Sequence, residues 1–289
     1  MLNKLLDYEF RATRRTFGGI YLALALVSAA LGLLSHHMLQ SAPLGQLGHI
    51  ELETNGAAGI SAAVLSLAYF AILVALGVLT VLTIVERFHK NLLGYEGYLM
   101  HTLPVTPGQL IASKLISGLA WVLISMVMVG LTLMLILGLT MVGYGEMFSY
   151  LLQELQAGLQ QAFSTIGVSP FLLAAAALCM ILSGCASTIL CVYAACMIGH
   201  QLPRWHLPAG IAAFFALGAA QSWICGAAAF VAGVLARGLG IDAAAFVKDL
   251  NVNVQLLLEA SGTVLICALF GTVYFLLARW LLQNRLNLE

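Results

Sequence analysis

Charged residues are scarce in this chain of 289 residues. Asp, Glu, Lys and Arg make up only 8% of it, whereas a soluble globular protein carries about 25%. The 12 basic residues are matched by 12 acidic ones, so no positive excess is left to bind a phosphate backbone, and we expect no nucleic-acid partner. With 62% hydrophobic residues and a mean hydropathy of +1.00, the chain is predicted to be a membrane protein.

The usual motifs of catalysis and metal binding are also missing. The sequence contains no G-x-x-x-x-G-K-[ST] phosphate loop, no H-E-x-x-H and no paired C-x-x-C, and its six cysteines are spaced unlike zinc ligands. Ser125, Ser183 and Ser187 have no His or Asp within their apolar stretches to activate them. We therefore expect no catalytic residue, no metal site and no cofactor bound by this chain itself.

Long uncharged stretches are abundant instead. Six of them, each of at least 18 residues, contain no Asp, Glu, Lys or Arg, and each is long enough to cross a hydrocarbon core about 30 Å thick. Their composition does not alternate as in outer-membrane strands, so we predict helices. The expected fold is an all-α membrane protein, one transmembrane domain over residues 1–289, with spans at about 17–39, 61–85, 115–139, 171–198, 207–234 and 261–278.

The basic residues predict the orientation. An even number of spans places both termini on one side, and loops rich in Lys and Arg stay in the cytoplasm. With cytoplasmic termini, only Arg237 and Lys248 lie outside, and the inner segments hold Lys4, Arg11, Arg14, Arg15, Arg87, Lys90, Lys114, Arg204, Arg279 and Arg285. We therefore predict that both the N- and the C-terminus are cytoplasmic.

Three segments between the spans have a helical pattern. Residues 1–16 gather apolar side chains on one face and arginines near their end, which predicts an interfacial helix, with a disordered basic tail as the alternative. Residues 144–163 are amphipathic and are predicted to lie on the outer leaflet or to cap the bundle, either as structural cover or as a substrate contact. Residues 235–260 fit two short re-entrant or surface helices.

The inner loop, residues 86–114, carries the most information. Leu92, Tyr95, Tyr98 and Leu99 form a short apolar and aromatic stripe that ends before a proline, which predicts a small helix under the membrane. The segment from Thr106 through Pro107 to Gln109 then has the pattern of a capping box that starts the next helix. Tyrosine is a frequent interface anchor, so this loop either docks a protein or lies among the lipid headgroups.

No charged residue lies in the central part of any predicted span. Proton and ion relays are built from such residues, so a secondary transporter is disfavoured. The polar residues that are present are uncharged and often flanked by Gly or Ala, as in Ser183-Gly-Cys-Ala-Ser187. They favour close helix packing, with a pathway for a large amphipathic substrate as the alternative. No substrate-binding residue is assigned.

The inner loop, with Arg87-Phe-His-Lys-Asn-Leu92 followed by Glu96-Gly-Tyr-Leu-Met-His-Thr-Leu-Pro-Val105, together with six spans and an N-terminal helix, resembles ABC transporter permeases of the type-2 exporter class. The resemblance covers the whole chain in topology and about 25 residues closely. It implies that the loop is a coupling helix for an ABC ATPase subunit, which binds ATP and Mg. The coupling residues it implies are Asn91, Leu92, Leu93, Gly94, Tyr95, Glu96, Gly97, Tyr98, Leu99 and Met100.

The same resemblance implies that Lys4, Arg11, Arg14 and Arg15 of the interfacial helix also contact the ATPase subunit. It further implies a second permease subunit, identical or different, and a location in the cell membrane, with the bacterial cytoplasmic membrane as first choice. The expected function is ATP-driven export of a peptide, antibiotic or drug-like amphipath, with no enzymatic activity in this chain. The alternative is a non-transporting sensor or immunity protein that docks a cytoplasmic partner.

Overall fold

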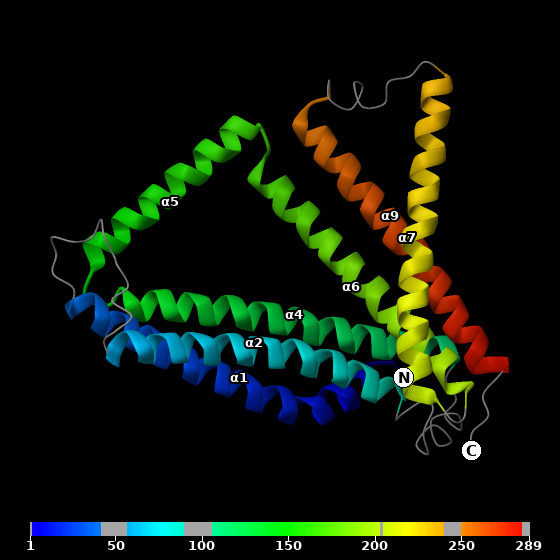
Figure 1. Cartoon of the computed structure of the whole chain (residues 1–289), viewed down its shortest axis with the longest axis horizontal. Coiled ribbons are helices and arrows are strands. Elements are labelled where there is room, and N and C mark those ends of the chain that lie inside the picture. Colours follow the sequence, from blue (N-terminus) through cyan, green and yellow to red (C-terminus); the bar gives the residue numbers. More distant parts are fainter. Residues whose placement is uncertain (1, 42–56, 90–105, 203–204, 240–249, 285–289) are drawn as a thin grey trace. The chain divides into compact units, whose positions relative to one another are not determined.

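The structure is a computed structural model that describes residues 2–41, 57–89, 106–202, 205–239 and 250–284 (Figure 1). These ranges contain helices and no strand, so the predicted all-α fold is confirmed. The helices are α1 (Leu2–Ser41), α2 (Ala57–Phe88), α4 (Pro107–Thr140), α5 (Gly145–Ile166), α6 (Pro170–His200), α7 (His206–Gly238) and α9 (Val252–Asn284).

All of these helices except α5 are long and apolar enough to cross a membrane. Their apolar segments run from 28 residues in α1 to 34 in α4. At about 1.5 Å rise per residue, even the shortest exceeds a hydrocarbon core of about 30 Å. The chain is therefore a multi-pass membrane protein with six candidate spans, as the sequence predicts.

The helices extend beyond the predicted spans. Residues 2–16 and the first predicted span lie in one continuous helix, α1, so the segment predicted to be interfacial is helical, and its place at the interface stays a prediction. Both ends of the segment 235–260 likewise belong to the long helices α7 and α9. A span predicted from charge ends at the first ionisable residue, whereas the backbone hydrogen bonds of a helix continue past it into water. No proline interrupts α1, and Gly18 and Gly19 each weaken a helix by only about 1 kcal/mol.

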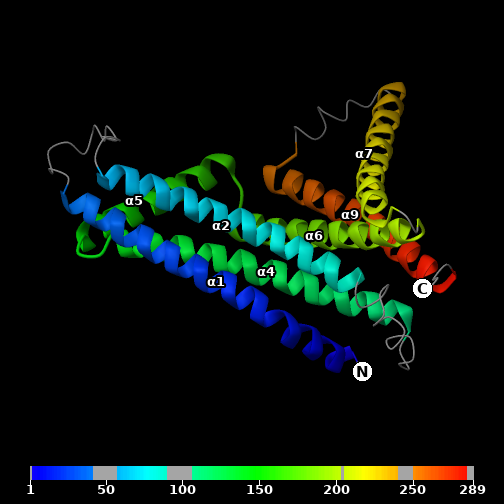
Figure 2. The same cartoon turned by 60° about the horizontal axis from the view of Figure 1, so that its bottom comes forward.

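The chain divides into two compact units. The N-terminal unit comprises residues 3–83 and 120–158, and the C-terminal unit comprises residues 1–2, 84–119 and 159–289. In the N-terminal unit, α1, α2 and the second part of α4 lie side by side (Figures 1 and 2). Phe17 and Leu24 of α1 and Tyr69 and Leu76 of α2 form its buried core.

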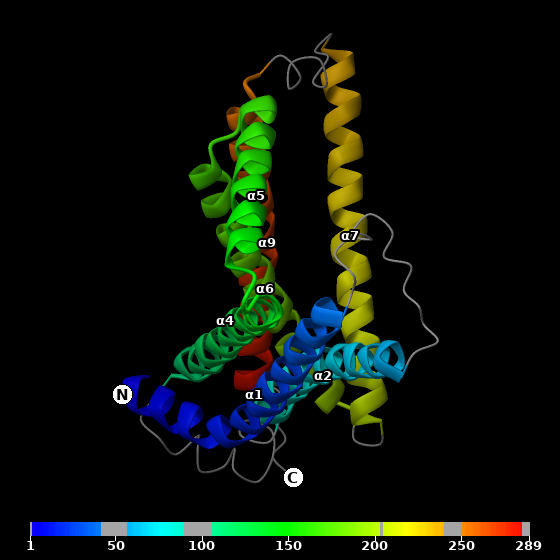
Figure 3. The same cartoon turned by 90° about the vertical axis from the view of Figure 1, so that its left-hand side faces the viewer.

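In the C-terminal unit, α6 packs against both α7 and α9. Gly210 of α7 approaches α6 so closely that an added Cβ would lie 3.7 Å from the carbonyl oxygen of Ala195. Gly271 brings α9 onto Leu190 in the same way, at 3.6 Å. Beyond this contact α7 separates from α6 and α9 (Figure 3), and Trp223 on its second half is 79% exposed.

Candidate partner-binding site at the inner loop

The predicted coupling residues, Asn91–Met100, lie outside the described residues. The structure does describe the two chain segments that carry this loop, which we call the loop stems. They are residues 86–89 at the end of α2 and residues 106–114 at the start of α4. Both stems belong to the C-terminal unit, so their packing against α6 and α9 defines the base on which the loop is built.

An aromatic pair holds the first stem. The ring of Phe88 is fully buried and stacks on Tyr193 of α6, with 4.1 Å between ring centroids and 9° between ring planes. Such a pair contributes about 0.5–1.5 kcal/mol beyond the area that it buries. One residue further, the ring of His89 lies edge-on to His200 of α6 at 5.8 Å. The last turn of α2 is therefore fixed to the end of α6.

The second stem begins at the predicted capping box. The backbone N–H of Thr106 donates to Oε1 of Gln109 over 3.2 Å, and Pro107 is the first residue of α4. This confirms the helix start that the sequence predicts, because a side-chain acceptor at the third position satisfies an amide left open at the helix end. The backbone N–H of Leu110 also donates to the carbonyl oxygen of Thr106 over 3.2 Å.

Buried residues follow directly. Leu110, Ile111 and Ser113 are almost completely covered, and Lys114 is only 2% exposed. The hydroxyl of Ser113 donates to the carbonyl oxygen of Leu110 over 2.8 Å. A buried lysine this close to a helix start is unusual, since ammonium groups are rarely covered. The second stem is therefore largely buried from Leu110 onward.

Two glycines in and next to the second stem mark where α4 contacts other helices at ordinary van der Waals distance. An added Cβ at Gly118 of α4 would lie 3.5 Å from Cδ1 of Ile189 in α6 and 3.6 Å from Cγ1 of Ile84 in α2. At Gly108 it would lie 3.5 Å from the ring of Phe275 in α9. The first loop stem thus contacts α6 through Phe88, and the second contacts α9 at Gly108. The sequence does not identify Phe88, Tyr193 or Ile189 as packing residues, because the role of each depends on a contact with a helix distant in the chain.

The predicted basic contacts lie on α1, in the N-terminal unit. Arg11, Arg14 and Arg15 are exposed, and their spacing of three and four residues places them on one helix face. Nη2 of Arg11 lies 3.2 Å from Oδ2 of Asp7, an exposed pair worth little in stability. Nothing is described of the side chain of Lys4. The structure therefore brings these three arginines together, while their contact with an ATPase subunit stays a prediction.

Tyrosines pair with polar residues between spans. The Tyr21 and Ser125 hydroxyls are 2.8 Å apart, joining α1 to α4, and those of Tyr69 and Thr132 are 3.1 Å apart, joining α2 to α4. In the C-terminal unit the Tyr274 hydroxyl donates to Oε1 of Gln221 over 2.9 Å. Thr132 and Gln221 thus join neighbouring spans, while a substrate pathway remains a prediction. The tyrosines that complete the pairs were not singled out in the sequence.

Comparisons with known proteins give no match: no family model, no curated protein and no solved structure matches the chain. Among the described residues, no three metal-ligating side chains come together. The features on which a function can be argued are therefore the inner-loop sequence, the six spans and the packed loop stems.

Proposed function

We propose that this chain is the membrane-spanning permease subunit of an ATP-driven exporter of the type-2 ABC class. The observation that carries the proposal is the inner loop: a docking stripe in the sequence, mounted on two stems that are packed against other spans. A loop that served only as an anchor in the lipid headgroups would not require stems that are packed against α6 and α9.

In this proposal a separate ATPase subunit binds ATP and Mg and contacts Tyr95, Tyr98 and Leu99 of the loop. Movement of the loop reaches α4 through the capped turn at Thr106, and it reaches α6 through the ring stack of Phe88 on Tyr193. Close-packed interiors move between discrete arrangements rather than deforming continuously. ATP then shifts the inward and outward states only if it binds them with different affinity.

The proposed cargo is an amphipathic compound such as a peptide, antibiotic or drug-like molecule. The central parts of the spans carry hydroxyl and amide groups and no charge, which suits a weakly polar substrate better than an ion. A second permease subunit, identical or different, would complete the pathway together with α7, whose most apolar stretch has no buried residue.

The test is co-purification from the native membrane. The tagged chain is solubilised gently, and the proteins retained with it are identified by mass spectrometry. We expect a soluble chain that carries a phosphate loop and an ABC signature. The double substitution Tyr98→Ala/Leu99→Ala should remove that ATPase and the cargo-stimulated ATP hydrolysis while leaving the permease monodisperse.

A matched control uses the Tyr150-Leu151 pair of α5, which the predicted topology places on the opposite side of the membrane. Tyr150→Ala/Leu151→Ala should leave the ATPase bound. If the ATPase is retained equally by both double variants, the loop is not the coupling segment. Recovery of a kinase in place of an ATPase would favour the sensor or immunity function instead.

A further inference from the structure

Helix α5 presents an apolar face that no part of the described chain covers. At 100° per residue its large apolar side chains fall within one arc, and they are between 38% and 59% exposed: Phe148, Leu151, Leu152, Leu155 and Leu159. The opposite arc carries Ser149, Gln153, Glu154, Gln160 and Gln161. A soluble helix of this kind would bury its apolar face against protein, whereas the described residues leave the apolar face of α5 exposed.

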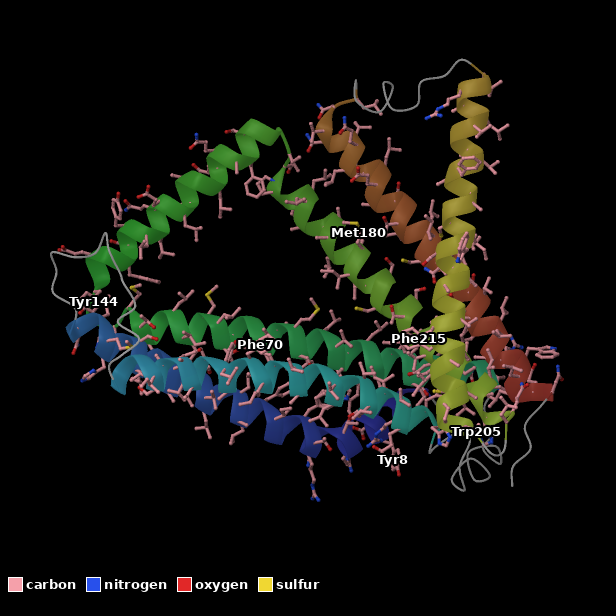
Figure 4. All side chains as sticks on the ribbon, viewed as in Figure 1. Tyr8, Phe70, Tyr144, Met180, Trp205 and Phe215 are labelled. Atoms are coloured by element: carbon pink, nitrogen blue, oxygen red, sulfur yellow. The ribbon has the colours of Figure 1, made fainter. Side chains whose placement is uncertain are left out.

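Both ends of α5 are tied to ends of membrane spans. Four residues separate it from α4 and three from α6, and the chain turns at Gly143 (φ +82°) and Gly167 (φ +73°), where a side chain would be strained. At the first end, Nδ1 of His36 donates to the carbonyl oxygen of Thr140 over 3.2 Å, and the His36 ring meets Tyr144 edge-on. Tyr144 is labelled in Figure 4.

At the second end, Asn253 in the first turn of α9 holds the connection to α6. Its Nδ2 donates to the carbonyl oxygen of Gly167 over 2.7 Å, and its Oδ1 accepts from the backbone N–H of Ser169 over 3.0 Å. Since α5 is not itself a candidate span, α4 ends and α6 begins at the same membrane face. Both ends of a helix about 33 Å long are thus held at that face.

These tethers limit what can cover the apolar face. Three or four residues reach at most about 10–14 Å, so α5 cannot leave the surface of the bilayer that surrounds α4 and α6. Leu133 and Met134 near the end of α4 and Phe171 near the start of α6 are exposed, so these spans also offer apolar side chains to lipid near their ends. An amphipathic helix held at this depth buries its apolar arc in the acyl boundary and keeps its polar arc in water.

The charged residues of α5 indicate which lipid headgroup it can bind. No Lys or Arg occurs between Thr140 and Pro170, and the polar arc carries the carboxylates of Glu146 and Glu154. Interfacial helices that need anionic lipid use basic residues, each worth about 1 kcal/mol near the surface. Attachment of α5 must therefore come from apolar burial, and zwitterionic phospholipid is sufficient.

From these observations we infer that α5 is an interfacial helix at the membrane face where α4 ends, which is the outer leaflet in the predicted orientation, with Phe148, Leu151, Leu152, Leu155 and Leu159 in the acyl boundary of zwitterionic phospholipid. The inference does not depend on the proposed transport function.

The experiment places one added tryptophan on each face of α5 in the full chain. Leu155→Trp reports on the apolar arc and Gln153→Trp on the polar arc, each in nanodiscs of phosphatidylcholine brominated near the headgroup. The unaltered chain supplies the signal of the four native tryptophans for subtraction. We expect bromolipid to quench the tryptophan at 155 several-fold more than the one at 153, and aqueous iodide to do the reverse.

Three results would overturn the inference. Equal iodide quenching at both positions would place the apolar arc in water. Protection of position 155 from both quenchers would mean that protein covers it, either a second copy or another subunit. A signal at 155 that appears only with phosphatidylglycerol present would contradict the lipid assignment. If either variant aggregates, Leu159→Trp and Gln160→Trp form a second matched pair on the same two arcs.

Discussion

The two connections that flank α4 are held in different ways. At its start, the loop stems bury Leu110 and Ile111 in protein, and the ring of Phe88 has no exposed surface. At its end, α5 carries leucines of similar size that no described residue covers, and Leu155 is 59% exposed. In a membrane protein, a side chain that no protein covers is not necessarily in water, because it can also be covered by lipid.

The two environments respond differently to substitution. A cavity inside packed protein stays open, since the surrounding side chains relax only partly. Acyl chains are fluid and fill the space left by a shortened side chain. Loss of a large residue should therefore be costly at the loop stems and cheap on a lipid-facing surface, and the following predictions test this contrast in order of decreasing effect.

Phe88→Ala should lower the free energy of unfolding by about 3 kcal/mol, because it leaves a cavity against Tyr193. Phe70→Ala is the matched control on the same helix, since Phe70 (Figure 4) is 62% exposed and faces outward, and it should cost less than about 1 kcal/mol. Unfolding in mixed micelles, followed by near-ultraviolet circular dichroism, measures both. Equal losses would remove the distinction between protein and lipid cover.

Gly32→Ala should cost about 2 kcal/mol by overpacking the junction of α1 with the C-terminal end of α4. An added Cβ would lie 2.8 Å from Cβ of Leu139 and 3.1 Å from the carbonyl oxygen of Ile136, and neither atom can move without the backbone. The control is Gly130→Ala on α4. An added Cβ there meets nothing within 4 Å, so this substitution should be neutral or slightly stabilising. The same unfolding assay measures both variants. A neutral Gly32→Ala would show that α1 does not pack tightly against the last turns of α4.

Gln109→Ala should cost about 0.5 kcal/mol, because the N–H of Thr106 loses a side-chain acceptor but can still bond to water. Amide hydrogen exchange at Leu110 and Ile111 should become faster, since the first turn of α4 frays more often. Gln153→Ala, on the polar arc of α5, caps nothing and should leave exchange in α4 unchanged. Unaltered protection in Gln109→Ala would mean that tertiary packing alone holds this stem.

The carboxylate of Glu154 raises the pKa of Tyr150, by accepting its hydrogen bond and by its negative charge. A raised pKa means that this contact is fully present below the ordinary tyrosine pKa of about 10 and is lost as the pH rises through the higher folded value. Glu154→Gln should lower the pKa of Tyr150, measured as the tyrosinate absorbance missing from a Tyr150→Phe reference, whereas Glu146→Gln should leave it in place. An unchanged pKa in Glu154→Gln would show that the two side chains do not meet on the polar arc.

The amino-acid sequence predicts most of the fold and little of the site. Uncharged runs locate six spans, and the period of residues 144–163 locates α5, because composition alone decides which segments enter lipid. Thr106 and Pro107 mark the start of α4 through local bonds. By contrast, the stacking of Phe88 on Tyr193 could not be predicted, because it joins helices distant in the chain. The full lengths of the helices could not be predicted either, because backbone hydrogen bonds continue past the charged residues that limit an uncharged run.

The charge pattern of α5 has a consequence for how the chain is made. With the predicted orientation, this segment must be passed across the membrane during synthesis. It has no Lys or Arg to retain it in the cytoplasm, and it is too polar to stop in the bilayer as a span. A membrane potential that is negative inside favours the outward transfer of each carboxylate by about 2.3 kcal/mol per 100 mV. Glu146 and Glu154 thus let an energised membrane assist the export of this segment, and basic residues in their place would oppose it.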